Sequence, residues 1–133
     1  MVMTTVLRPL ALVFGLLILA EGAQAQDAGI KRMVLQRTDV VGTAYECVLG
    51  KADIPPGMSI GRHTHHGVEV GYIAAGAIEL MIEGQGTLHL KAGDSYTIPA
   101  GLAHDAANMG STVSTAMATW VVEKGKPLSV PAP

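Results

Sequence analysis

From Lys31 onward, the sequence is divided into short runs of apolar and β-branched residues by glycine, proline and aspartate. Short runs bounded by turn-forming residues are typical of strands in an all-β sandwich or barrel. No stretch combines sustained helical spacing of apolar residues with helix caps, so we expect little helix. The predicted strands are residues 32–36, 44–54, 68–74, 78–82, 87–91, 95–98 and 112–122.

The chain of 133 residues, 49% of them hydrophobic, is long enough for one domain with a core of its own. Its start differs from the rest: Arg8 precedes an apolar run over 10–20, and Ala23 and Ala25 follow in the pattern of a signal-peptidase site. We therefore predict a signal peptide over 1–25, cleaved after Ala25, and an exported protein that is periplasmic or secreted. The alternative is an apolar N-terminal helix docked on the fold.

Behind the signal peptide we expect a single barrel domain over 26–126 and a flexible C-terminal tail over 127–133, which is rich in proline. The apolar run of the signal peptide is shorter than the ~20 residues of a membrane helix, so no membrane contact is expected after cleavage. Lys and Arg total 9 against 11 Asp and Glu, and these charges are scattered. This balance argues against a nucleic-acid partner and favours a small molecule.

Cys47 is the only cysteine, which excludes an intrachain disulfide. Its neighbours form a strand-like run, so we expect a half-buried strand residue rather than a reactive thiol. Tyr45, Tyr72, Tyr96 and Trp120 are expected to pack in the core or across strands, as aromatic residues in strands usually do.

Two histidines stand two residues apart at His63 and His65, and Glu69 follows four positions later. Residues i and i+2 of a strand point to the same side, so the two imidazoles can reach one point, and Glu69 can return to it across a bend at Gly67. A proline- and glycine-containing turn over 99–101 precedes His104 and can bring a fourth side chain to the same place.

Three imidazoles and one carboxylate suit one divalent transition-metal ion, such as Fe, Mn, Ni, Cu or Zn, and lack the thiolates of a closed structural zinc site. We therefore predict that His63, His65, Glu69 and His104 are metal ligands and that the ion keeps an open position for a ligand. His66 has the opposite parity and is expected to face away. His89 alternates with Leu88 and Leu90 and is expected to face solvent.

At these residues the sequence resembles the cupin superfamily, whose two motifs it matches without a gap. The first motif corresponds to Gly57, His63, His65, Glu69 and Gly76, and the second to Gly93, Pro99, Gly101, His104 and Asn108. The resemblance is to small single-domain members of the quercetin-dioxygenase type. It implies a jelly-roll β-barrel, a metal ion held by the four residues already named, and frequent formation of a homodimer.

Membership of this superfamily does not name a reaction. The cupin lyases that cleave dimethylsulfoniopropionate carry a tyrosine two residues after the metal-binding glutamate, where this chain has Gly71. Oxalate-degrading cupins need a cation near the metal, and we expect none of Arg32, Arg37 and Arg62 to point inward. Alternate residues of a strand share a face, so Gly71, Ile73 and Ala75 are expected on the same side as Glu69, where they would form a partly apolar cavity wall.

The leading hypothesis is an exported metal-dependent oxidoreductase, dioxygenase-like, that acts on a small enol- or phenol-type organic molecule. The ion would chelate the enol or phenolate oxygen and present it to dioxygen, and Glu69 would act as a base as well as a ligand. The alternatives are a non-catalytic protein that binds a small molecule and a metal-dependent isomerase or lyase.

Overall fold

The computed structural model describes residues 29–133, so the predicted signal peptide lies outside the described part of the chain. The described residues form strands joined by turns and loops. The strands are β1 (Lys31–Asp39), β2 (Tyr45–Ile54), β3 (His63–Thr64), β4 (Gly67–Ala75), β5 (Ala77–Ile82), β6 (Gly86–Lys91), β7 (Ser95–Ile98), β8 (His104–Ala107), β9 (Ser114–Glu123) and β10 (Val130–Pro131).

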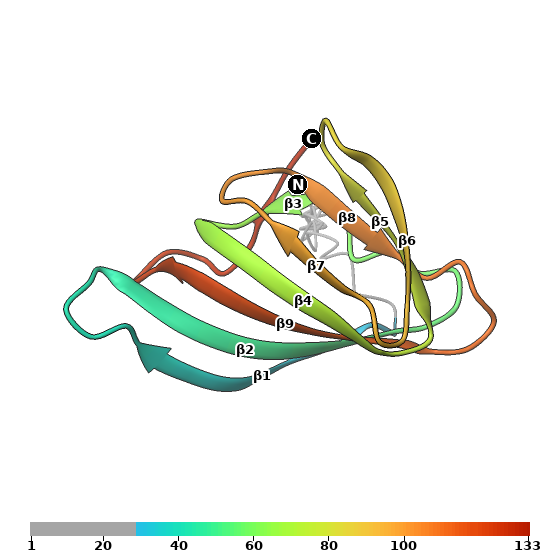
Figure 1. The fold of residues 1–133 in the computed structure, drawn as a ribbon, viewed down its shortest axis with the longest axis horizontal. Coiled ribbons are helices and arrows are strands. Elements are labelled where there is room, and N and C mark those ends of the chain that lie inside the picture. The colour runs from blue at the N-terminus through green and yellow to red at the C-terminus, as the bar shows by residue number, and fades with distance from the viewer. Residues whose placement is uncertain (1–28) are drawn as a thin grey trace, which may run out of the picture.

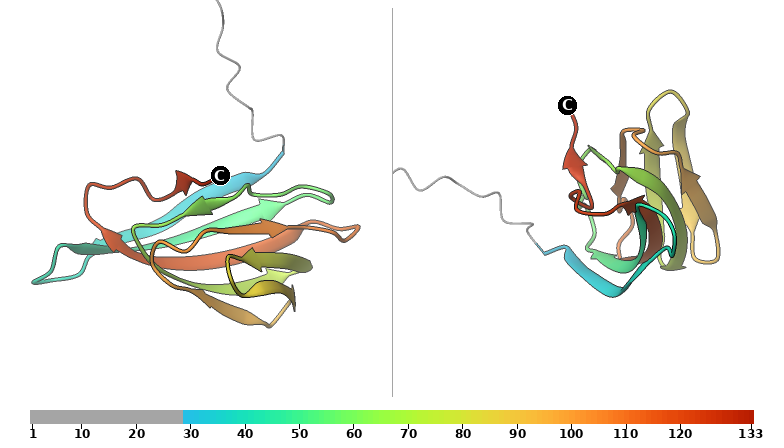
Figure 2. Two further views of the ribbon diagram at one scale, coloured as in Figure 1. Left: turned by 90° about the horizontal axis from the view of Figure 1, so that it is seen from above. Right: turned by 90° about the vertical axis from the view of Figure 1, so that its left-hand side faces the viewer.

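The strands build two antiparallel sheets (Figures 1 and 2), with the orders β1-β2-β9-β4-β7 and β10-β3-β8-β5-β6. The chain crosses from one sheet to the other between β2 and β3 and returns between β3 and β4, so sequence neighbours often lie in different layers. This arrangement is a jelly roll, and the all-β fold class predicted from the sequence is confirmed.

Between the sheets, inward-facing residues of alternating strand positions form the core. Ile54, Ile73 and Ile98 come from one sheet and Ile78, Leu80 and Ile82 from the other. The alternation is clear in β4, where Glu69, Gly71 and Ile73 are buried while Val70 and Tyr72 are exposed. Glu69 therefore lies on the inner face, and the sheet directs its carboxylate between the layers.

All seven predicted strands are present, and the structure adds three short ones, β3, β8 and β10. β3 and β10 have two residues each, too few for a recognisable alternation, and β8 reads His-Asp-Ala-Ala, which lacks β-branched residues. The C-terminal residues also differ from the loose tail we expected. Val130 pairs with Thr64 and Pro131 with His63, so this segment is docked against the strand that carries His63.

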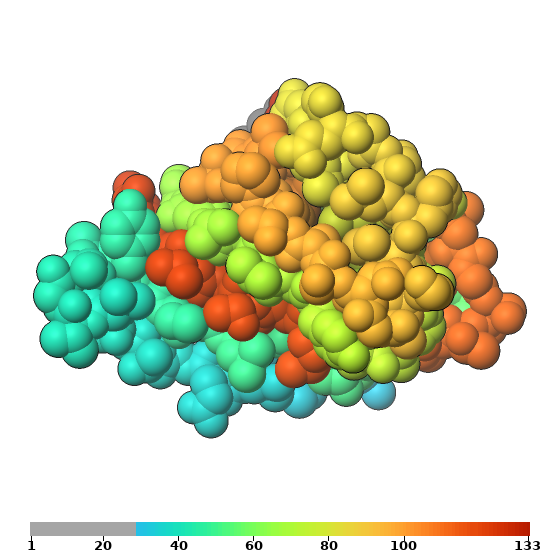
Figure 3. Space-filling view, in the orientation of Figure 1, coloured from blue at the N-terminus to red at the C-terminus, as the bar shows by residue number. Residues whose placement is uncertain are grey.

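β1 is an edge strand of its sheet, and Met33, Val34 and Leu35 are exposed along it. The hairpin of β1 and β2 projects from one end of the molecule (Figure 3). An exposed apolar edge of this kind is where a second copy can add to a sheet, and the homodimer stays a prediction.

Cys47 is half-buried on β2, as expected. Within residues 29–133, no helix is long and apolar enough to cross a membrane.

Gly76 alone links β4 to β5, and its backbone has a φ of +72°. A Cβ at this position would lie 2.5 Å from Ser114 Oγ, whose hydroxyl bonds the backbone of Ala77. Gly84 has a similar φ of +74° but open space around it. A substitution at Gly84 therefore costs only backbone strain, whereas one at Gly76 costs the same strain and a steric clash with Ser114.

We predict that Gly84→Ala lowers the free energy of unfolding by about 1–2 kcal/mol, the cost of a left-handed backbone with a side chain. Gly76→Ala adds about 1–3 kcal/mol for overpacking against Ser114. Urea denaturation of both variants measures the difference. Equal losses would show that Ser114 moves aside without cost.

Candidate metal centre

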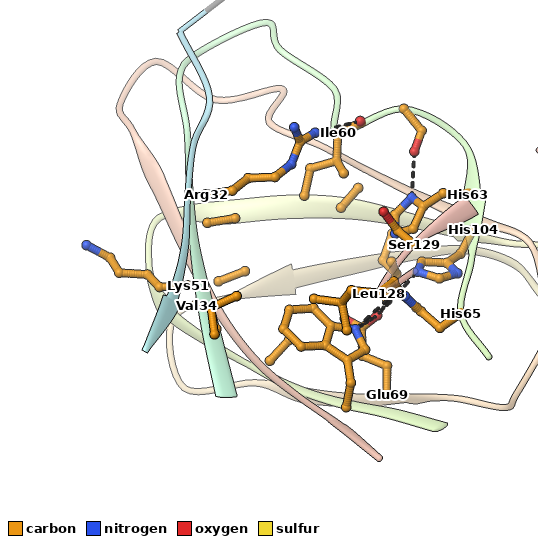
Figure 4. A pocket seen from close by; sticks show the side chains of 18 of the residues that line it. Arg32, Val34, Lys51, Ile60, His63, His65, Glu69, His104, Leu128 and Ser129 are labelled. Atoms are coloured by element: carbon orange, nitrogen blue, oxygen red, sulfur yellow. Dashed lines mark hydrogen bonds and ion pairs between the residues drawn. The ribbon is translucent and has the colours of Figure 1, made fainter. Parts of the chain in front are cut away.

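The four predicted ligands come together in the structure. His63 belongs to β3, His65 lies in the link between β3 and β4, Glu69 lies on β4, and His104 begins β8, where it stands opposite His63. One potential ligand atom from each residue lies within 4.8 Å of the other three. Both sheets therefore contribute to a single cluster, whose side chains are seen from close by in Figure 4.

Backbone carbonyl groups fix the orientation of all three imidazoles. The Nδ1 atom of His63 lies 2.7 Å from the Gly61 carbonyl oxygen, and that of His104 lies 2.9 Å from the Leu102 oxygen. His65 Nδ1 bonds the carbonyl oxygen of Leu128, near the C-terminus. A carbonyl oxygen only accepts hydrogen bonds, so each Nδ1 carries the proton and each neutral ring keeps its lone pair on Nε2.

The lone pairs of His65 and His104 face the carboxylate of Glu69 at short range. Glu69 Oε2 lies 2.8 Å from His65 Nε2 and 3.3 Å from His104 Nε2. In the neutral tautomer no proton lies between these atoms, and His104 Nε2 is buried without a hydrogen-bond partner among the described residues. An unpartnered buried lone pair beside a carboxylate oxygen is costly, and a cation bound between the two atoms would remove this cost. Two ligands at about 2.1 Å from one ion are about 3 Å apart, which these separations match.

Two aromatic residues hold the carboxylate of Glu69. The Tyr96 hydroxyl donates to Oε1 at 2.8 Å, and the Trp120 indole N–H lies 2.9 Å from Oε2 and 3.1 Å from His65 Nε2. Sequence reasoning assigned both aromatics to packing. The alternation of side chains along their strands is consistent with both residues facing inward. The pairing that places Trp120 opposite Glu69, however, depends on strand register, which the sequence alone does not give.

The charges of the cluster are coupled. Burial alone would raise the pKa of Glu69, but the adjacent rings of His104 and His65 and the hydrogen bond from Tyr96 outweigh it and hold that pKa well below its usual range. Burial and the charge of Glu69 raise the pKa of Tyr96, so its hydroxyl stays protonated and can donate. Burial lowers the pKa of His63, which favours the neutral, metal-binding ring.

The cluster lies at one end of a cavity of about 470 Å³. Apolar residues form much of the wall, among them Val34, Ala52, Ile60, Leu80, Ala106, Ala116 and Ala118. The C-terminal segment contributes Leu128, Ser129 and Pro131, and Figure 4 shows Leu128 and Ser129 beside the histidines. A volume of this size accommodates a small organic molecule.

Two expectations about this cavity are wrong. Gly71, Ile73 and Ala75 do not line it: Ile73 is in the core, and a Cβ on Gly71 would lie 2.0 Å from Tyr96 Cζ, so this glycine makes room for the tyrosine ring. Arg32 and Arg62 do line it, although we expected no arginine to face inward. Arg32 stands opposite Ala52 on the inner face of β1 and donates to the Ile60 carbonyl oxygen at 2.9 Å.

The two other histidines of the chain lie outside the cluster. His66 is exposed, as its parity predicted. His89 is exposed on β6, and its Nδ1 lies 3.4 Å from Glu79 Oε1. The bend that we expected at Gly67 lies at His65 and His66 instead. Gly67 begins β4, where a Cβ would come within 1.9 Å of the Val121 carbonyl oxygen, so glycine allows β4 to approach β9 closely.

The sequence matches the family model described as "Cupin domain" over residues 50–122, more than half of the chain. The chain is therefore a member of the cupin family, as its two motifs predicted. No curated protein matches the chain significantly.

Solved structures share this fold at low sequence identity. A conserved protein with a double-stranded β-helix domain from Klebsiella pneumoniae is 24% identical, with a TM-score of 0.62 over 78% of this chain and 84% of that one. KdgF from Halomonas sp. is 22% identical, with a TM-score of 0.61 over 76% and 87% of the two chains. The DMSP lyase DddQ from Ruegeria pomeroyi is 23% identical, with a TM-score of 0.60, over 65% of this chain but only 43% of the lyase.

Removal of residues 127–133 is predicted to weaken metal binding by about 10–100-fold, since His65 loses the carbonyl group that holds its ring. Leu128→Ala is the matched control because it keeps that carbonyl, and we expect its affinity to stay close to that of the wild type. Competition titration with Zn²⁺ measures both. Unchanged affinity in the truncated chain would contradict a role for this segment in the site.

Acid is predicted to release the metal. Burial opposes protonation of His104, but a proton on its Nε2 would bond Glu69, and this bond, the bond to Leu102 and the nearby charges raise its pKa overall. A proton on His104 competes with the metal, so affinity for Zn²⁺ falls as the pH drops through that raised pKa, from a pH above the ordinary imidazole value of about 6.5. Titrations between pH 8 and pH 5.5 test this, and an affinity independent of pH would contradict it.

Proposed function

We propose that this cupin is an exported metal-dependent oxidoreductase, dioxygenase-like, that acts on a small enol- or phenol-type organic molecule. The observation that carries the proposal is the convergence of three oriented imidazoles and one carboxylate at the end of a largely apolar cavity. A set without thiolates, open to a cavity, is typical of catalytic rather than structural metal sites.

An ion held by His63, His65, Glu69 and His104 would supply Lewis acidity toward an enol or phenol oxygen and a redox-active centre for dioxygen. The chain's own backbone carbonyl groups orient the histidines, and a largely apolar wall surrounds the cavity beside them. Because a dioxygenase adds both oxygen atoms to its substrate, the substrate provides the electrons and no separate reductant is needed.

Glu69 fits the role of a ligand better than that of a base. Its pKa is held well below the usual range, which makes its carboxylate a weak proton acceptor near neutral pH. The sequence hypothesis gave Glu69 both roles, and the structure supports the metal-ligand role more strongly.

Two alternatives use the same site. A binding protein would capture a small molecule through the metal and the apolar wall without changing it. An isomerase or lyase would use the Lewis acidity alone, and a DMSP lyase is among the proteins that share the fold. The arginines at the cavity also remove our reason for disfavouring acidic substrates such as oxalate. At 22–24% identity, these neighbours support the fold and do not choose among the reactions.

The proposal predicts stoichiometric Fe, Mn, Ni or Cu in protein purified from its native compartment, with oxygen uptake when enols, catechols or flavonols are added. His104→Ala is expected to lose both metal and uptake, since it removes a ligand at the junction of the two sheets. His89→Ala is the control, because His89 is exposed and away from the cluster.

The possible results separate the candidates. Metal without oxygen uptake, together with a ligand recovered unchanged after incubation in air, would replace the oxygenase with a binding protein. Metal without uptake but with turnover of a substrate under nitrogen would indicate an isomerase or lyase. Equal metal content in wild type and His104→Ala would contradict the site itself.

A further inference from the structure

The two oxygens of the Glu69 carboxylate have different surroundings. Oε2 faces the imidazoles, at 2.8 Å from His65 Nε2 and 3.3 Å from His104 Nε2. Oε1 accepts a hydrogen bond from the Tyr96 hydroxyl at 2.8 Å. One oxygen is thus directed at the common point of the ligands, and the other is held by a neutral donor.

The donors come from the two strands that flank Glu69 in the sheet. Trp120 lies on β9 directly opposite Glu69, and its indole N–H is 2.9 Å from Oε2. Tyr96 lies on β7 opposite Gly71, two residues along β4 from Glu69. The side chain of Glu69 is therefore held from both sides within one sheet.

Each aromatic ring occupies space that a glycine provides. A Cβ on Gly71 would lie 2.0 Å from Tyr96 Cζ, and a Cβ on Gly50 of β2 would lie 2.7 Å from Trp120 Cζ3. Neither glycine has a positive φ, so their backbones do not require glycine. The space beside them is what admits the rings, and through the rings the donors reach Glu69.

We propose that Tyr96 and Trp120 are positioning residues that make Glu69 a metal ligand through Oε2 alone. The inference rests on the metal site of the proposed function and adds that only one oxygen of its carboxylate binds the metal. A carboxylate that binds through both oxygens occupies two coordination positions. Tyr96 keeps Oε1 engaged, and so leaves one of these positions to a substrate oxygen.

The two donors have different tasks. Trp120 also lies 3.1 Å from His65 Nε2, but that lone pair belongs to the ion when one is bound, which leaves Oε2 as its acceptor. Loss of the indole N–H then weakens the hold on the ligand oxygen itself. Loss of the Tyr96 hydroxyl frees Oε1 to bind as well, which changes the number of ligand atoms rather than only the affinity.

Titration with Co²⁺ tests this in the intact protein, because the visible absorption of Co²⁺ weakens as its coordination number rises. We expect Tyr96→Phe to show weaker absorption per bound Co²⁺ and a smaller spectral response to azide, which competes for the open position. Trp120→Phe is expected to bind Co²⁺ about 10–100-fold more weakly. Tyr72→Phe, on the exposed face of the same strand as Glu69, is expected to match the wild type in all respects.

Each outcome has one meaning. If the wild type binds Co²⁺ and both variants match it in spectrum and affinity, the positioning role is overturned and the metal site stands. If the wild type binds no Co²⁺, the metal site is overturned, and the proposed function with it.

Thermal melting checks that each variant is folded. Should either variant fail to fold, the wild type still gives a test, because Trp120 is the only tryptophan and gives a single indole N–H signal in NMR spectra. With Zn²⁺ bound, this proton is expected to exchange slowly with water, at least tenfold more slowly than that of a free indole. Exchange at the rate of free indole would overturn the hydrogen bond to Glu69 and the inference.

Discussion

The hydrogen bonds from three histidine Nδ1 atoms to backbone carbonyl groups are the interactions on which the site depends. They leave the lone pairs of His63, His65 and His104 on Nε2 and bring those of His65 and His104 close to Glu69, inside a protein interior where unpaired polar atoms are costly. A proton can bridge only one histidine nitrogen and the carboxylate. A single metal ion can accept a lone pair from all three Nε2 atoms and from Glu69, and we therefore interpret the cluster as a metal centre.

The rest of the fold serves to bring these carbonyl groups and side chains to one place. They are drawn from both sheets and from the C-terminal segment, so the cluster forms only when the jelly roll is closed. Because glycine has no side chain, Gly67 lets β4 approach β9, and Gly71 and Gly50 leave space for the rings of Tyr96 and Trp120. Metal binding at this cluster would therefore be coupled to barrel closure, since an ion bound only by the folded state stabilises it.

The sequence was sufficient for the fold class and for the four residues that converge in the cluster, because both depend on local signals. Alternation and turn residues mark the long strands, and the fixed spacing of the two motifs selects His63, His65, Glu69 and His104. The features that the sequence did not predict depend on strand register and on short strands. The inward-facing Arg32, the contacts of Tyr96 and Trp120 with Glu69, and the docking of Leu128 on His65 each join segments far apart in the chain. A proline-rich end reads as a loose tail until the strand that it pairs with is known.

A crystal structure of the Zn²⁺-loaded protein, with anomalous scattering recorded at the zinc edge, would show whether the cluster is a metal centre. We expect one strong anomalous peak at about 2.0–2.2 Å from Nε2 of His63, His65 and His104 and from Oε2 of Glu69, with Oε1 still bonded to Tyr96. A peak bonded to Nδ1 atoms, an ion elsewhere on the surface such as at His66 or His89, or no ordered zinc at the cluster would contradict it.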